Sequence, residues 1–286
     1  MTNQIAIIGG GINGLVAANY LARGGARVTI YELRDKIGGA CVSETVDIKG
    51  TKYDIPLGAT VLGFMQDFVF EETGLSACLE TSAPNHPKII YYPNQDDPIN
   101  IYRNPEALRQ ELSSKCKERG DICQFRQDES RVVSYLQDGY RKALTPSLSH
   151  ARSILGPELT KRFIEGSARD LLNHYFTAEK TKTYVGMTVI ESGPVSLDSP
   201  FSAFNIPLLD SGSVFDGYWG FVKGGIWRVT EELKRINEEM GIRINTSTCI
   251  NSTEELDEDI IILATDPITA ARITGTKLSR KNYLGT

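Results

Sequence analysis

The chain has 286 residues, a formal net charge of −5 and 41% hydrophobic residues. This length and apolar content predict one or two domains with a substantial core, and the acidic balance argues against a nucleic-acid partner. The five cysteines are scattered and odd in number, which does not indicate a disulfide framework, and no apolar run is long enough to predict a membrane span. Because no signal peptide is apparent at the N-terminus, a reduced, cytoplasmic chain is the simplest expectation.

The first forty residues predict a strand–helix–strand unit. Residues 4–8 form a short, apolar, β-branched run that is typical of a strand buried on both faces of a parallel sheet. Residues 13–23 follow as a helix with small residues on its apolar side, and residues 27–31 form the second strand. This order of elements favours a nucleotide-binding α/β domain.

Three glycines between the first strand and the helix indicate the ligand. Gly9, Gly11 and Gly14 have G-x-G-x-x-G spacing, which suits a tight turn, a close approach of the backbone to a pyrophosphate, and close helix–strand packing, respectively. Ile12 and Asn13 lie at the start of the helix, where unpaired N–H groups favour a diphosphate. The motif therefore predicts a site for the ADP half of a dinucleotide.

An acidic residue and a second glycine pair refine this prediction. Glu32 follows the second strand, about 20 residues beyond the second motif glycine, where its carboxylate can bind the ribose hydroxyls and repel a 2′-phosphate. Leu33 follows it directly, and Gly38, Gly39 and Ala40 are expected to approach the pyrophosphate closely. The second glycine pair favours FAD over NAD, although an NAD-dependent dehydrogenase and a glycine-rich turn without a ligand stay open as alternatives.

The rest of the chain predicts further elements in order. They are a strand over 88–92, helices over 105–118 and 130–143, one or two further helices over 159–176, a loop over 192–213, an amphipathic helix over 226–240, and strands over 242–250 and 259–264. We interpret residues 1–80 as the ADP half of an FAD-binding domain and residues 81–212 as a substrate domain. Residues 213–286 are expected to return to the nucleotide-binding sheet.

Residues 9–32 and the following segment 34–40 (Arg-Asp-Lys-Ile-Gly-Gly-Ala) resemble the extended FAD signature of glutathione-reductase-type flavoproteins. More narrowly, the chain resembles the phytoene desaturase-like and carotenoid oxidoreductase group, with segments 53–59, 167–176 and 219–225 supporting the resemblance in order. The resemblance implies an α/β fold with a glutathione-reductase-type, Rossmann-like FAD-binding domain and a discontinuous α+β substrate domain.

The resemblance also adds cofactor-binding candidates, each with a purely structural role as its alternative. They are Leu57, Gly58, Ala59 and Thr60 beside the isoalloxazine, Ile250 at the adenine, and Ala264 and Thr265 at a strand end. No catalytic side chain can be assigned from the sequence.

Cysteine, histidine and tryptophan residues give weaker signals. Cys41 has no second cysteine close by, so we expect it to be a small packed residue rather than a redox group. Cys116 and Cys123 have no histidine near them in the sequence, so no metal site is expected. His174 could face a substrate and Trp219 could line an apolar pocket, but structural roles are the default for both.

By resemblance, the chain is expected to be an FAD-dependent oxidoreductase that desaturates or oxidises an apolar or amine-bearing small molecule. Members of the resembled group are longer and end in a glycine-rich segment that closes over the flavin, whereas this sequence stops at Thr286. We therefore expect one part of a split flavoenzyme that a partner chain completes. A non-catalytic module that binds FAD or an adenine nucleotide is the alternative. Because the group acts on lipids, peripheral membrane contact stays open.

Overall fold

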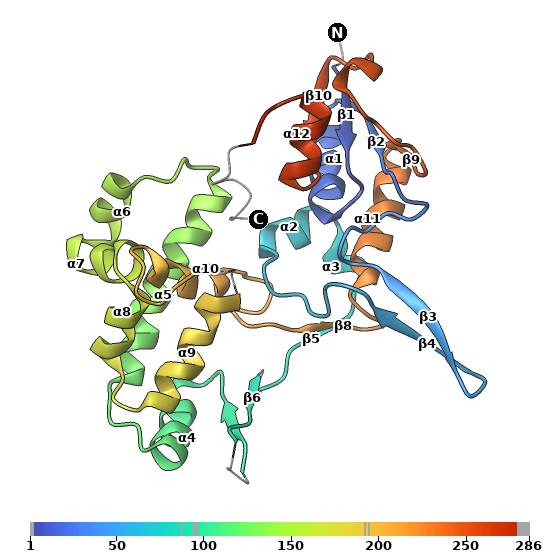
Figure 1. Ribbon diagram of the computed structural model, residues 1–286. Coiled ribbons are helices and arrows are strands. Elements are labelled where there is room, and N and C mark those ends of the chain that lie inside the picture. Colours follow the sequence, from blue (N-terminus) through green and yellow to red (C-terminus); the bar gives the residue numbers. More distant parts are fainter. Residues whose placement is uncertain (1–2, 87, 94–96, 192, 194, 279–286) are drawn as a thin grey trace. The chain divides into compact units, whose positions relative to one another are not determined.

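The computed structural model describes residues 3–86, 88–93, 97–191, 193 and 195–278, and Figure 1 labels its elements. The chain forms two compact units. Unit 1 takes its described residues from Met1–Leu62, Phe68–Ser82 and Phe221–Thr286, and unit 2 takes its residues from Gly63–Asp67 and Ala83–Gly220. The functional division at residues 80 and 212 stays a prediction. Every helix in the described part of the chain is too short or too polar to cross a bilayer.

A four-stranded parallel sheet forms the centre of unit 1 (Figure 1). Its strands are β1 (Gln4–Ile8), β2 (Arg27–Tyr31), β9 (Arg243–Asn245) and β10 (Ile260–Leu263), in the order β10-β1-β2-β9. Strand β1 pairs with β10 on one side and with β2 on the other, and its residues from Ile5 to Ile8 are buried. Burial on both faces of a parallel sheet therefore explains the continuous apolar run of β1, as predicted.

Two helices of unit 1 pack against each other, α1 (Ile12–Arg23) and α11 (Trp227–Glu239). Asn237 of α11 donates a 2.9 Å hydrogen bond from Nδ2 to the Leu15 carbonyl, and Asn19 donates from its own Nδ2 to Asn237 Oδ1 at 3.0 Å. Both amides are almost fully buried, as is Leu233 of helix α11. The strands and helices predicted for residues 4–31 and 226–240 are confirmed, with helix boundaries that differ by one residue.

Unit 1 also contains a β-hairpin that was not predicted from the sequence. Strands β3 (Ser43–Ile48) and β4 (Thr51–Pro56) pair antiparallel and project from the unit (Figure 1). Lys49 and Gly50 form the two-residue turn, and both have positive φ, 55° and 84°. Such a turn matches the twist of the flanking strands. The remaining elements are α2 (Asp67–Glu72), α3 (Leu75–Cys78), the paired β5 (Thr81–Ser82) and β8 (Phe221–Val222), the 3-10 turn Thr253–Glu255, and α12 (Pro267–Thr274).

The strand predicted over 242–250 is wrong beyond Asn245. After β9 the backbone leaves the sheet, and the Ser247 and Thr248 N–H groups donate to the carbonyls of Arg34 and Glu32 at 2.8 and 2.9 Å. Ser247 has φ +52°, a conformation that ends an extended run. Residues 246–250 therefore form a loop across the end of β2, in spite of their alternating pattern.

Unit 2 is mainly helical. Its elements are the paired strands β6 (Lys88–Ile90) and β7 (Ile99–Ile101), helices α4 (Pro105–Cys116), α5 (Ile122–Arg141), α6 (Leu148–Leu155), α7 (Pro157–Thr160), α8 (Ala168–Tyr175), α9 (Glu179–Glu191) and α10 (Asn205–Leu209), the π turn Lys161–Glu165 and the 3-10 turn Ser202–Phe204. Apolar side chains from these helices form one core, in which the ring of Phe125 contacts Phe163, Tyr175 and Phe176.

Two predictions for unit 2 need correction. The helix expected over 130–143 begins eight residues earlier at Ile122, because Asp121 caps it by accepting a 2.9 Å hydrogen bond from the Gln124 N–H. The loop expected over 192–213 contains a 3-10 turn and α10, since Ile206 and Leu209 are buried. The serine, proline and glycine content of that segment concealed a short apolar run that packing stabilises as a helix.

Candidate functional site

The first turn of the glycine motif requires a glycine at its first position. Gly9 has φ +114°, and its N–H donates to the Tyr31 carbonyl at 2.8 Å. A Cβ atom on Gly9 would lie 2.5 Å from the carbonyl oxygen of Ala264 at the end of β10. Residue 9 must therefore be a glycine for the chain to pass from β1 to α1 between β2 and β10.

The second glycine pair folds against the first. Gly38 donates a 2.8 Å hydrogen bond from its N–H to the Gly10 carbonyl, and Gly11 and Gly38 form a parallel bridge. Gly38 and Gly39 have φ values of +131° and +60°, which side chains would strain. Gly11 caps α1 with no side-chain hydrogen bond, so the first N–H groups of the helix stay available to a ligand. This arrangement is the cradle that a diphosphate needs.

Glu32 is held rigidly at the end of β2. It is 7% exposed, and its Oε2 accepts a 2.8 Å hydrogen bond from the Gly10 N–H. Its Oε1 accepts from the Arg34 N–H at 2.9 Å and lies 3.5 Å from Arg34 Nε. Because an ionised carboxylate has about four acceptor positions, acceptor capacity remains for the two hydroxyls of a ribose. The carboxylate therefore links the glycine turn to the expected ribose position.

A cavity of about 350 Å³ opens at the carboxyl ends of β1, β2 and β10. This is the edge at which open α/β sheets bind ligands. The residues that line the cavity are Ile8, Gly9, Gly11, Tyr31, Glu32, Leu33, Arg34, Gly39, Thr248, Cys249, Ile250, Ala264, Thr265, Asp266, Thr269, Arg272 and Ile273.

The structure places the predicted site residues in three groups. The residues that line the cavity are Gly9, Gly11, Glu32, Leu33, Gly39, Ile250, Ala264 and Thr265. Ile12, Asn13 and Gly14 form the first turn of α1 behind Gly11, and Gly38 supports Gly39. The segment Leu57, Gly58, Ala59 and Thr60 lies outside the cavity lining and packs against Ala40, whose carbonyl accepts from the Ala59 N–H at 2.8 Å. Direct contact of these residues with a flavin stays a prediction.

Seven polar residues of the cavity were not predicted from the sequence. They are Tyr31, Arg34, Thr248, Cys249, Asp266, Thr269 and Arg272. Arg34 could have been found from its position two residues after Glu32. Thr248 and Cys249 precede Ile250 in the loop that crosses β2. The two α12 residues have no local signal, because their place at the site depends on the pairing of β10 with β1.

We expect Glu32→Ala to weaken FAD binding by about 1.5–3 kcal/mol, the contribution of a hydrogen bond to a charged group. The variant also removes the acceptor of two backbone N–H groups, so the glycine turn loses a support. Glu32→Gln keeps the shape and one acceptor oxygen and should bind with intermediate affinity. Flavin fluorescence titration gives the dissociation constants, and an unchanged affinity in Glu32→Ala would refute the ribose assignment.

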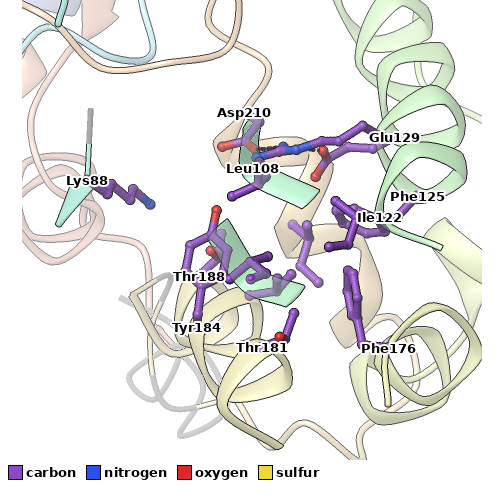
Figure 2. A pocket seen from close by; sticks show the side chains of 14 residues that line it. Lys88, Leu108, Ile122, Phe125, Glu129, Phe176, Thr181, Tyr184, Thr188 and Asp210 are labelled. Carbon is purple, nitrogen blue, oxygen red and sulfur yellow. Dashed lines mark hydrogen bonds and ion pairs between the residues drawn. The ribbon is translucent and has the colours of Figure 1, made fainter. Parts of the chain in front are cut away.

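Three charged side chains of unit 2 form a cluster of ion pairs, in which Glu129 is buried and Arg126 and Asp210 are partly buried. Arg126 Nη1 lies 2.5 Å from Glu129 Oε2 and 3.6 Å from Asp210 Oδ2. Figure 2 shows Glu129 and Asp210 at one end of a pocket, with Tyr184 and Thr188 farther along it. Burial raises the pKa of Glu129 and of Asp210, and Arg126 opposes both shifts. The pocket holds only about 30 Å³, enough for one or two water molecules, so it is too small for a substrate.

A larger, mostly apolar cavity of about 850 Å³ lies elsewhere in unit 2. Phe64, Trp219, Tyr140, Leu208 and Leu209 supply its apolar lining, and Gln66, Glu191 and Ser211 supply polar groups. The Phe64 and Trp219 rings lie 6.2 Å apart in a tilted contact. Pockets of this size and lining are typical of small-molecule sites. Trp219 therefore lines a cavity. From the sequence, this was the less favoured interpretation, and a structural role was the default.

The structure also shows the surroundings of Cys41, of His174 and of the side chains that could bind a metal. Cys41 is buried, and burial raises the pKa of its thiol, as is typical of a packed and unreactive cysteine. His174 is exposed and contacts the ring of Tyr175. Among the residues that the structure describes, no three metal-binding side chains gather at one point.

Comparison with known proteins agrees with this geometry. A family model described as an NAD(P)-binding Rossmann-like domain matches residues 7–67. The chain is 22% identical over 269 residues to a 4,4′-diapophytoene desaturase of Staphylococcus haemolyticus, covering 92% of this chain and 50% of that protein. It is 25% identical over 267 residues to a 4,4′-diaponeurosporene oxygenase of the same organism, covering 88% and 50%. The chain thus spans about half the length of these relatives.

Two solved structures have the same fold. A redesigned putrescine oxidase aligns with a TM-score of 0.58 and 19% identity, over 99% of this chain and 62% of that one. Cyclohexylamine oxidase from Brevibacterium oxydans aligns with a TM-score of 0.55 and 16% identity, over 100% and 63%. The predicted resemblance to phytoene desaturase-like proteins and the predicted Rossmann-like α/β fold are therefore confirmed.

Proposed function

We propose that this chain binds FAD through its ADP half and works as an FAD-dependent oxidoreductase. The observation that carries the proposal is the buried Glu32 carboxylate, bonded to the Gly10 N–H and placed beside the paired glycine segments of one cavity. The glycine backbones fit a diphosphate and the carboxylate fits a ribose. A flavin bound there would supply the redox chemistry, and the protein would orient it.

For the substrate we propose an apolar small molecule. The lining of the 850 Å³ cavity is dominated by aromatic and leucine side chains, which favour an apolar ligand over a small amine. The staphylococcal relatives are named for carotenoid substrates, whereas the aligned oxidases are named for amines. The cavity lining supports the first class.

A partner chain that completes the flavin site and a cytoplasmic location both stay proposals. Gel filtration of the chain in the presence of FAD, expressed with and without candidate partner chains, would test the partner. A monomer that holds FAD tightly and turns over alone would rule the partner out.

Cys249 offers a direct test of the binding site. It is exposed in the cavity wall, whereas Cys78 is exposed at the end of α3 and lies outside the lining. At ten times the Kd, FAD or ADP should slow alkylation of Cys249 by about tenfold through mass action. The rate at Cys78 should not change. Peptide mapping by mass spectrometry measures both rates, and an unprotected Cys249 would contradict the proposed site.

Catalysis requires a second measurement on the same protein. Anaerobic addition of a polyene hydrocarbon should bleach the absorbance of bound flavin, and a diamine of similar length should not. If the flavin binds but neither substrate class reduces it, either in the chain alone or in the chain expressed with its candidate partner chains, the chain is a non-catalytic nucleotide-binding module instead.

A further inference from the structure

Helix α12 (Pro267–Thr274) forms one wall of the nucleotide cavity. Thr269, Arg272 and Ile273 line the cavity, and their i, i+3, i+4 spacing places them on one helix face. The helix follows Ala264 and Thr265 closely, and the Ala264 carbonyl lies against Gly9. This wall therefore begins at the glycine turn, where a diphosphate is expected, whereas the loop with Ile250 crosses the end of β2.

The charged side chains of the cavity are Glu32, Arg34, Asp266 and Arg272, and all but one have partners in the protein. Arg34 donates from Nη2 to the Gly39 carbonyl at 3.0 Å and lies beside Glu32. Asp266 Oδ1 caps α12 by accepting from the Ile268 and Thr269 N–H groups at 3.0 and 2.9 Å. Within the described part of the chain, the exposed Arg272 guanidinium has no hydrogen-bond or ion-pair partner.

We propose that Arg272 is a phosphate-binding residue, whose guanidinium pairs with the diphosphate of the bound nucleotide. This inference rests on the proposed function and deepens it. A helix N-terminus supplies only about half a unit of positive charge, and the cavity also holds two carboxylates that repel phosphate. A guanidinium provides a full charge and a planar fork that matches two phosphate oxygens. Arg272 is placed to offset the negative charge of the ligand.

The test compares ADP with adenosine on the full 286-residue chain. Arg272→Ala should weaken ADP binding by about tenfold or more, the range for a charge-assisted hydrogen bond, and should leave adenosine binding unchanged. Arg272→Lys should keep part of the affinity, because lysine retains the charge without the fork. The matched control is Arg243→Ala, which removes the same charge from an exposed residue of β9 outside the lining. Calorimetry gives the ADP affinity, and ligand-observed NMR gives the adenosine affinity.

Each result has a defined meaning. Loss of ADP affinity alone, with a shallower dependence on salt concentration, supports the phosphate contact. Equal losses for ADP and adenosine, or an ADP affinity that matches the Arg243→Ala control, overturns it. If the unmodified chain binds neither ligand, the proposed nucleotide site itself fails, and Arg272 fails with it.

Discussion

Gly11→Ala should lose most of its FAD affinity while the chain remains folded. Gly11 has φ −75° and ψ 176°, a backbone conformation that alanine adopts freely. The nearest atom to a Cβ at this position is Gly39 Cα at 3.6 Å, an ordinary van der Waals distance. In the free protein the methyl group therefore fits. It lies on the cavity lining, however, where the backbone must approach the pyrophosphate.

The expected loss follows from this overlap. Forcing one extra methyl group into a packed contact costs about 1–3 kcal/mol, which corresponds to roughly 5- to 150-fold in Kd. Gly11→Val should weaken binding further, since its two γ-carbons extend into the same space. Flavin fluorescence titration measures the affinity, and circular dichroism checks the fold. Retained FAD affinity in the valine variant would refute the interpretation of the whole motif.

The sequence predicted the parts of the site that are built from neighbouring residues. Gly9, Gly11 and Gly14 each have a local backbone role, so their spacing alone carries the information. The same holds for Glu32, which ends a strand of clear pattern. Within unit 1, these residues lie in one contiguous strand–helix–strand unit, and their placement needs no knowledge of distant contacts.

The rest of the cavity depends on contacts that are distant in the sequence. Strand β10 enters the sheet beside β1, and this pairing brings Arg272 into the lining of the cavity. The Thr248 N–H reaches the Glu32 carbonyl across the end of β2, and that bond turns an alternating segment into a loop. Local pattern favoured a strand there because Ile244 and Ile250 alternate with polar residues. A single sequence without its sheet order contains no signal for either arrangement.

Helix α10 illustrates a different limit. Its segment is surrounded by serine, glycine and proline, which are typical of loops. Ile206 and Leu209 are nevertheless buried, and α10 contacts α5 and α9. Tertiary packing therefore outweighs a weak local propensity, as it does for most short helices.

Gly14→Ala should destabilise the fold of unit 1, in contrast to Gly11→Ala, which should leave the chain folded. Gly14 is buried, and a Cβ there would lie 2.1 Å from the Gly9 carbonyl oxygen. Both atoms belong to the packed junction of β1 and α1, so the helix must move away from the sheet. We expect a loss of about 3 kcal/mol or more, at the upper end for overpacking.

Thermal unfolding followed by circular dichroism measures this effect, and a loss of that size should lower the Tm by about 5–10 °C. The matched control is Gly139→Ala in α5, where no atom lies within 4 Å of the added Cβ. Because alanine favours a helix interior over glycine by about 1 kcal/mol, the control should keep or raise the Tm.

FAD binding should also fall in Gly14→Ala, since displacement of α1 moves the Gly11 backbone out of the cradle. An unchanged Tm in Gly14→Ala would show that the helix–strand junction tolerates a side chain, and the third glycine of the motif would then have no packing role.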